Sequence, residues 1–122
     1  MSAPEQRYPL RGEIWWTHFP FDPPEKNRPA IIVSSNARNA HPRAHTVLAI
    51  PLSTSVHKLA PGHLLLRAGE TGLREDGVAW ADNIGTVTKD QLREPIAGHL
   101  PLSHTQICRL AALVKIGMGC VE

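Results

Sequence analysis

An arginine and two hydroxyl side chains stand at the ends of two apolar runs in this sequence of 122 residues. Arg28 precedes the run AIIVSS, and Ser53 and Thr54 follow the run TVLAIPL. Arginine stays protonated and presents a planar fork of N–H donors that matches phosphate oxygens, while a hydroxyl can donate to one more oxygen. If the two runs form neighbouring antiparallel strands, the start of the first lies beside the end of the second. The arrangement then predicts a phosphate-sized site, although the spacing alone is more typical of a surface arginine and a polar turn.

Positive charge is concentrated in the middle of the chain. The formal net charge is only +2, yet the segment between Glu25 and Glu70 contains six basic and no acidic residues. Its basic residues are Lys26, Arg28, Arg38, Arg43, Lys58 and Arg67. A cationic surface attracts a polyanion through phosphate contacts and the release of counterions. We therefore expect a polyanion-binding patch here, unless folding spreads these charges over different faces or pairs them with acids from elsewhere.

The sequence lacks the common signatures of cofactor and metal chemistry. The glycine-rich dinucleotide and phosphate loops are absent, as are the HExxH, CxxC and GxSxG motifs. His41 and His45 have a spacing that suits two metal ligands on a helix, but Pro42 between them indicates a loop. His18 falls on an apolar strand face, where a packed histidine is more common than a ligand. We expect neither a cofactor nor a metal ion.

Short strands separated by turns should position these residues. Eleven prolines and nine glycines indicate many turns rather than long helices. The expected strands are Glu13–Phe19, Ala30–Ser34, Thr46–Leu52, His63–Leu66, Val78–Ala81, Asn83–Val87 and Ile96–Leu100. Residues 20–29 and 35–45 are expected to be loops, and Lys89–Leu92 is expected to form one helical turn.

One longer helix is predicted near the C-terminus. Ser103 and Gln106 have the spacing of a capping box, and Gly117 and Gly119 mark the end of the helix. An apolar stripe that should lie on the sheet consists of Ile107, Leu110, Ala111, Val114 and Met118. The predicted fold class is mainly β (α+β), a small and partly open barrel with a C-terminal helix.

The chain length suits one domain, which we place at residues 10–118 with a flexible arm at 1–9 and a tail at 119–122. The first residues do not resemble a signal peptide, and no apolar run is long enough to cross a bilayer. Cys108 and Cys120 are too few for a disulfide framework. We expect a cytoplasmic protein that does not engage a membrane.

Four motifs occur in an order that is familiar from one protein family. They are RGEIWW (11–16), NRPAIIVSS (27–35), TVLAIPLSTS (46–55) and REDGVAWADNIGTV (74–87), and the predicted helix follows them. Together they resemble the MazF/PemK family of toxin-antitoxin ribonucleases, over about Leu10 to Met118. The resemblance implies an SH3-like barrel of the MazF/CcdB toxin type, a homodimer whose groove takes single-stranded RNA, and a cognate antitoxin protein as partner.

The resemblance also implies a reaction and the residues that perform it. The reaction is metal-independent, sequence-specific cleavage of single-stranded RNA, in which a 2′-hydroxyl attacks the adjacent phosphate and leaves a cyclic phosphate. Arg28 matches the family's catalytic arginine, and Ser53 matches a hydroxyl residue that is usually threonine. Thr54, His57 and Glu25 are possible catalytic or supporting residues. Because arginine is a poor general base, proton transfer would use His57 or water.

RNA contacts are expected from the cationic segment and from the proline-rich loop before Arg28. The residues we expect to bind RNA are Lys26, Arg38, Arg43, Lys58 and Phe21. Phe21 lies in the loop, where a ring is available to stack on a base, whereas tryptophans in strands are more often core residues. The loop lacks the family's Ser-Glu-Gln-like element and retains only Glu25, so substrate contacts there are open.

Two alternatives remain. The CcdB branch of the same fold poisons DNA gyrase without enzymatic activity, through a C-terminal tail that contains tryptophan. This chain has no tryptophan after Trp80. The second alternative is an inactive relative that binds RNA or antitoxin, and the presence of Arg28 beside a hydroxyl argues against it.

Overall fold

The computed structural model describes residues 8–56, 59–96 and 100–120. Its strands are β1 (Ile14–Thr17), β2 (Arg28–Ile32), β3 (Thr46–Ser53), β4 (His63–Leu66), β5 (Gly77–Trp80), β6 (Gly85–Thr88) and β7 (Glu94–Pro95). The α-helices are α1 (Asn36–Ala40), α2 (Ala68–Thr71) and α3 (His104–Gly117), and two 3₁₀ turns span Ala81–Asn83 and Lys89–Gln91. No helix in the described part of the chain is long and apolar enough to span a membrane.

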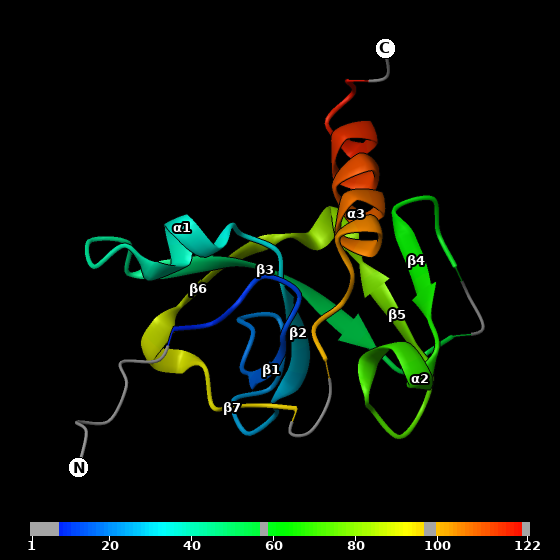
Figure 1. Cartoon of the computed structure of the whole chain (residues 1–122). Coiled ribbons are helices and arrows are strands. Elements are labelled where there is room, and N and C mark those ends of the chain that lie inside the picture. Colours follow the sequence, from blue (N-terminus) through cyan, green and yellow to red (C-terminus); the bar gives the residue numbers. More distant parts are fainter. Residues whose placement is uncertain (1–7, 57–58, 97–99, 121–122) are drawn as a thin grey trace.

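The seven strands form one antiparallel sheet that does not close (Figure 1). The strand order is β4-β5-β3-β2-β1-β7, and β6 pairs with the first half of β3. Leu52 and Ser53, at the other end of β3, pair with β5 instead. This change of partner along one edge of β3 curves the sheet, and the mainly β class with a C-terminal helix is confirmed.

Both faces of the central strands are buried. On one face Ile31 and Ile50 pack with Ile107 and Leu110 of α3. On the other face Ala30 and Ile32 belong to a second core. That second core consists of Phe19, Ala30, Ile32, Val47, Ala49 and Val87, with Trp15 packed against it. Strands buried on both faces read as continuous apolar runs, which explains the sequence of β2 and β3.

The helix α3 packs against the core of the sheet from its first turn to Val114. The Ser103 side chain accepts a hydrogen bond from the Gln106 backbone N–H, as a helix N-cap does. The Gln106 side chain contacts Glu70 and Arg109 instead of completing the capping box. Ile107 and Leu110 are buried, and Val114 of the predicted apolar stripe packs against the same core. Ala111 and Met118 are exposed, and the C-terminal end of α3 projects beyond the sheet (Figure 1).

One prediction about local structure was wrong. Residues 36–40 form the helix α1 rather than a loop, because Ser35 caps the Arg38 N–H and the Asn39 side chain is buried. The Asn39 amide donates to the carbonyl oxygens of Pro9 and Ser34, which ties the helix to the start of the domain. A strand was also expected at Ile96–Leu100, and the short β7 ends just before this range. Ile96 and Leu100 are not part of a strand, and residues 97–99 lie outside the described residues.

The remaining strand predictions differ from the structure mainly at their ends. The strand expected from Ala30 begins at Arg28, two residues earlier, and ends at Ile32. Its pairing with β3 is antiparallel, as the phosphate-site hypothesis requires. Lys89–Gln91 forms the predicted single turn, as a 3₁₀ helix. The start of β2 and the end of β3 are therefore regular strand, and their side chains are held by the sheet.

Candidate active site

Arg28 and Ser53 lie side by side at one end of the β2–β3 pair. Ala30 pairs with Pro51, and continuing this antiparallel register by two residues places Arg28 beside Ser53. The Arg28 Nη1 group donates to the carbonyl oxygen of Leu52 over 3.2 Å. Both side chains are largely buried, with 9% of Arg28 and 8% of Ser53 exposed. The sheet therefore fixes both groups at one position.

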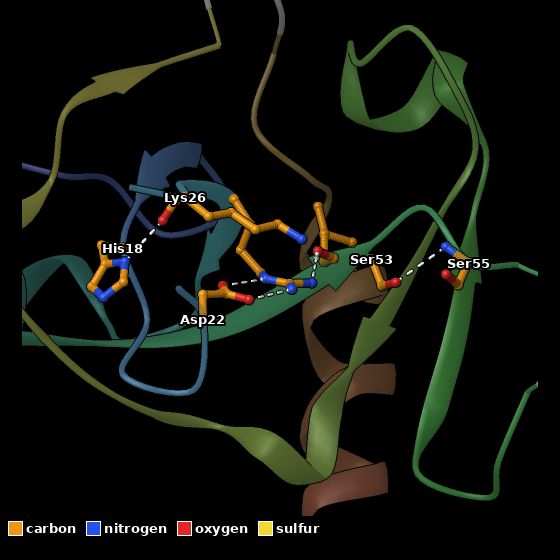
Figure 2. Close-up of polar contacts among 7 residues, drawn as sticks. His18, Asp22, Lys26, Ser53 and Ser55 are labelled. Atoms are coloured by element: carbon orange, nitrogen blue, oxygen red, sulfur yellow. Dashed lines mark hydrogen bonds and ion pairs between the residues drawn. The ribbon is translucent and has the colours of Figure 1, made fainter. Parts of the chain in front are cut away.

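The guanidinium of Arg28 forms a two-pronged ion pair with Asp22, from the loop between β1 and β2. Arg28 Nε donates to Asp22 Oδ2 over 2.7 Å, and Nη2 donates to Oδ1 over 2.6 Å (Figure 2). The hydrogen bond from Arg28 is the main cause of a lowered pKa of Asp22, and the charges of Arg28, Lys26 and His18 add to it against the opposing effect of burial. Asp22 is therefore a carboxylate at neutral pH, and it offsets the charge of Arg28 locally.

Aromatic rings lie around the same guanidinium. The Arg28 Cζ atom is 5.2 Å from the ring centroid of Phe21 and 5.0 Å from that of Trp80. Phe21 also stacks on Phe19, with 5.3 Å between centroids, and half of its surface is exposed. The Phe21 and Trp80 rings lie 6.0 Å apart, and His63 stacks on Trp80 with 6.0 Å between centroids. A cation over aromatic rings is held by their quadrupoles, so the rings add to the restraint on Arg28.

A pocket of about 470 Å³ opens beside Arg28 and Ser53. Its polar lining includes Lys26, Thr54 and Ser55, and the residues that line its apolar part are Trp16, Pro29, Leu52, Leu73 and Trp80. The connection of residues 73–76, between α2 and β5, forms one further wall. Apolar walls with a few convergent polar groups are typical of ligand sites.

The two hydroxyls at the end of β3 differ in their surroundings. Ser53 is the last residue of β3 and is buried, and its Oγ accepts a hydrogen bond from the Ser55 N–H over 3.1 Å (Figure 2). Thr54 lies beyond the strand and is exposed, and it lines the same pocket. Strand alternation does not decide where the Thr54 side chain points, because the strand ends at Ser53.

Several residues expected to bind RNA do not line the pocket. Arg38, on α1, donates to the backbone and the hydroxyl of Thr46, and Arg43 is exposed in the next loop. Arg67 pairs with Asp76 over 3.2 Å. Of the cationic segment, the described residues that line the pocket are Lys26 and Arg28. The segment therefore does not gather there as one patch.

The other residues predicted to act at the site are not part of the described pocket lining. Glu25 is exposed in the loop before β2 and does not line the pocket. Phe21 is not part of the lining either, but it contacts Arg28, as described above. His57 and Lys58 lie outside the described residues.

The histidines of the described chain have structural contacts. His18 lies just after β1, and its Nδ1 donates to the Lys26 carbonyl oxygen over 2.8 Å, which links the two ends of the loop that carries Asp22 (Figure 2). His41 Nδ1 accepts from the Arg43 N–H. Within the described ranges, no three His, Cys, Asp or Glu side chains gather as a metal ion would require.

Sequence reasoning missed Asp22 and Trp80. Asp22 stands in the stretch FDPP, where an aspartate reads as a turn residue. The one signal in the sequence is that an arginine buried at a strand end needs an anionic partner, and Asp22 precedes Arg28 by six residues in the same loop. Trp80 ends β5, and only the pairing of β5 with β3, the neighbour of β2, brings its ring near Arg28.

Comparison with known proteins places the chain in a family. The profile of the family described as PemK-like, MazF-like toxin of type II toxin-antitoxin system matches residues 10–116. The endoribonuclease MazF9 of Mycobacterium tuberculosis is 34% identical over 112 residues, which cover 87% of this chain and 92% of that protein. The endoribonuclease MazF6 of the same species is 30% identical over 96 residues, which cover 76% and 83%.

Solved structures agree with this placement. A mycobacterial endoribonuclease in complex with its cognate antitoxin has a TM-score of 0.71 at 25% identity, covering 93% of this chain and 98% of that one. The toxin in a MazE–MazF complex from Deinococcus radiodurans shares the fold, with a TM-score of 0.73 at 21% identity and coverage of 95% and 100%. This chain therefore belongs to the family of PemK-like, MazF-like toxins of type II toxin-antitoxin systems.

Proposed function

We propose that this protein is a toxin that cuts single-stranded RNA at specific sequences without a metal ion. The observation that carries this proposal is the buried Arg28, held beside the Ser53 hydroxyl at the edge of a pocket. The closely similar relatives are endoribonucleases, and the family match covers most of the chain. Because its substrate is RNA inside the cell, we place its action in the cytoplasm.

The proposed reaction is an internal transfer at one phosphate. The 2′-oxygen attacks phosphorus, the bond from phosphorus to the 5′-oxygen breaks, and a cyclic phosphate and a free 5′-hydroxyl result. Negative charge builds up on the non-bridging oxygens as the phosphorus becomes five-coordinate. Arg28 stabilises this charge with fixed N–H donors, which is the kind of contribution that often dominates catalysis. The Ser53 hydroxyl donates to one of the same oxygens and orients the phosphate.

Two protons must also move. One leaves the attacking 2′-hydroxyl and one reaches the departing 5′-oxygen. Arginine does not lose its proton in proteins, so Arg28 does not act as the base. His57 remains our proposal for proton transfer because it follows Ser53 closely in the chain, with water as the alternative.

Aromatic side chains near Arg28 provide surfaces on which RNA bases would stack. Single-stranded RNA exposes bases that stack on aromatic side chains, and the rings of Trp80 and Phe21 lie next to Arg28. The Trp16 and Trp80 side chains line the pocket, which therefore offers aromatic and apolar surface beside the site of phosphate binding. We assign the reading of the RNA sequence to this pocket and its 73–76 wall.

The first prediction concerns metal dependence. Purified protein is expected to cut a long unstructured RNA equally well with EDTA and with magnesium, because Arg28 supplies the positive charge that a metal would otherwise provide. Mapping the new ends should give cyclic phosphates and 5′-hydroxyls at a recurring short sequence. Cleavage that chelation abolishes would contradict metal independence. Tight RNA binding without cleavage would support the alternative of an inactive RNA-binding relative.

We propose a cognate antitoxin as the protein partner, since similar toxins have been solved with theirs. An acidic, partly disordered segment of the antitoxin would cover Lys26, Arg28 and the pocket, and so exclude RNA. Added to the cleavage assay, the antitoxin should inhibit the reaction and slow hydrogen exchange at the start of β2. Inhibition without protection of that region would place the antitoxin elsewhere.

We also propose that the protein is a homodimer. The C-terminal half of α3 exposes large apolar side chains, with Ile116 54% and Met118 74% accessible, and such surface is typical of an interface. Light scattering at micromolar concentration should give twice the chain mass of 13.4 kDa. Ile116→Asp should shift the protein toward monomer, and a wild-type protein that is already monomeric would contradict the proposal.

A further inference from the structure

The contacts of Arg28 leave only part of its donor capacity for a ligand. A guanidinium has five N–H groups. Asp22 accepts from Nε and Nη2, and the Leu52 carbonyl accepts from Nη1. One N–H therefore remains on each of the two terminal nitrogens, Nη1 and Nη2. These two nitrogens are neighbours, so together they can serve two oxygens of one phosphate.

The loop that carries Asp22 is organised to hold this carboxylate in place. The Asp22 N–H donates to the Phe19 carbonyl over 3.0 Å, and the Lys26 N–H donates to the Pro23 carbonyl over 2.9 Å, so two turns follow one another. His18 bonds to the Lys26 carbonyl and links the two ends of the loop. The Asp22 side chain is only 5% exposed. The loop therefore holds the Asp22 carboxylate in place, unlike a carboxylate on an exposed side chain that moves freely in solvent.

A carboxylate at this position has two opposing effects on an RNA enzyme. Its negative charge lies beside the path of a polyanion, so it weakens RNA binding. Its two oxygens occupy one whole edge of the guanidinium, so they prevent the phosphate from binding at that edge and the side chain from swinging away. Catalysis gains from this restraint, because a small misplacement of a catalytic group costs much of the rate.

We infer that Asp22 is a positioning residue: it blocks the Nε edge of Arg28 and presents the remaining Nη1 and Nη2 donors to the scissile phosphate. This inference rests on the proposed function, since it assumes that Arg28 acts on a phosphate. Asp22 itself does not touch the substrate. It acts only through the orientation of Arg28, and the neighbouring rings of Phe21 and Trp80 add a second restraint on the same group.

Asp22→Asn is the direct test, because it removes the charge and retains the shape. The amide keeps one acceptor oxygen, so one of the two bonds to Arg28 is lost. The single-turnover cleavage rate at saturating RNA should fall by about tenfold to 100-fold. The dissociation constant for RNA should stay unchanged or decrease, because a negative charge has left the binding path. A slower rate combined with equal or tighter binding is the signature of positioning.

The control is Asp90→Asn, which makes the same change of charge at an exposed residue outside the pocket. Rate and affinity should both stay within about twofold of the wild type. A purely structural role of Asp22 would instead weaken binding and rate together, with a lower melting temperature. Full cleavage by Asp22→Asn, or equal losses of rate and affinity, would overturn the inference.

Two further variants extend the test, and the first of them, Asp22→Glu, keeps it decisive if Asp22→Asn folds poorly. Asp22→Glu retains the charge but displaces the oxygens, so it should lower the rate with unchanged affinity, and full activity of this variant would overturn the inference. In an Arg28→Ala background, Asp22→Asn should leave the residual rate unchanged, because a residue that acts through Arg28 has no target there. A further loss in that background would show an independent role.

The two proposals fail in distinguishable ways. If the wild type cuts RNA and Arg28→Ala abolishes cleavage while Asp22→Asn does not, the positioning role is wrong and the proposed function stands. If the wild type does not cut RNA at all, the proposed function is wrong and the positioning role is overturned with it.

Discussion

Arg28→Ala is expected to slow RNA cleavage by about two orders of magnitude or more, because loss of one fixed donor to a developing oxyanion costs about 2.7–4 kcal/mol in the transition state. RNA affinity should fall much less, since one phosphate contact among several contributes modestly and Lys26 still lines the pocket. Single-turnover rates and dissociation constants measured on the same RNA separate the two effects. Equal losses of rate and binding would show that Arg28 only holds the RNA.

This variant needs a control, because removing Arg28 leaves the Asp22 carboxylate buried without its partner. A buried charge that loses its partner is strongly destabilising. The double variant Arg28→Ala with Asp22→Asn removes both charges and should recover much of the lost stability while remaining inactive. If the double variant regained the cleavage rate along with stability, the loss in Arg28→Ala would be one of folding and not of catalysis.

The hydroxyls at the end of β3 give a second control within the same experiment. Ser53→Ala should lower the rate more than the affinity, because Ser53 is fixed beside Arg28 by the sheet. Thr54→Ala should be milder, since Thr54 is exposed and lies beyond the last residue of β3. A larger loss of rate from Thr54 than from Ser53 would mean that the site has been assigned to the wrong hydroxyl.

Leu110→Ala is expected to have the largest effect on folding. Leu110 is fully buried where α3 meets Ile31 and Ile50 of the sheet, and a buried leucine cut to alanine costs about 2–5 kcal/mol of unfolding free energy. Denaturant titration should show a lower midpoint with an unchanged slope. Protein concentration must be held constant, because association contributes to the apparent stability.

The matched control is Leu100→Ala, which removes the same atoms from a side chain that is 82% exposed. Its unfolding free energy should change by no more than about 0.5 kcal/mol. Comparable losses for the two variants would mean that the first turns of α3 do not pack on the sheet as described.

The sequence was informative wherever the local pattern and the tertiary structure agree. The runs AIIVS and TVLAIPL are continuous because both of their faces are buried, and this marked them as central strands. Their antiparallel pairing then brings Arg28 to Ser53, so the main part of the candidate site could be anticipated from two runs and the residues at their ends. The helix α3 was recognisable from its cap at Ser103 and its apolar spacing.

The errors arise where distant contacts decide the local structure. In α1, Asn39 reads as a turn residue, but its buried amide bonds to the Pro9 carbonyl 30 residues earlier and stabilises a helix. The extent of the α3 contact also depends on where the sheet ends, and helical spacing alone does not reveal that Val114 packs on the core while Met118 is exposed.

The partners of Arg28 were missed for the same reason, because distant contacts bring them together. Asp22 lies in an irregular loop and Trp80 at the end of a separate strand, so neither has a local pattern that connects it with Arg28. The cationic segment misled for a related reason. Arg38 and Arg67 belong to the same cationic segment as Arg28. In the structure, however, Arg38 binds the backbone of Thr46 and Arg67 pairs with Asp76.

The pocket has two walls of different origin, and this bears on how such toxins diverge. Arg28 and Ser53 stand on strands whose other residues form the core, so a change there disturbs folding and chemistry together. The other wall, residues 73–76, is a surface connection between α2 and β5 that includes the exposed Arg74 and Glu75. Under the proposed function, we expect substitutions in this connection to change which base is accepted while Arg28 and Ser53 stay in place. One scaffold would then give rise to many cleavage specificities through a few mutations in a tolerant loop.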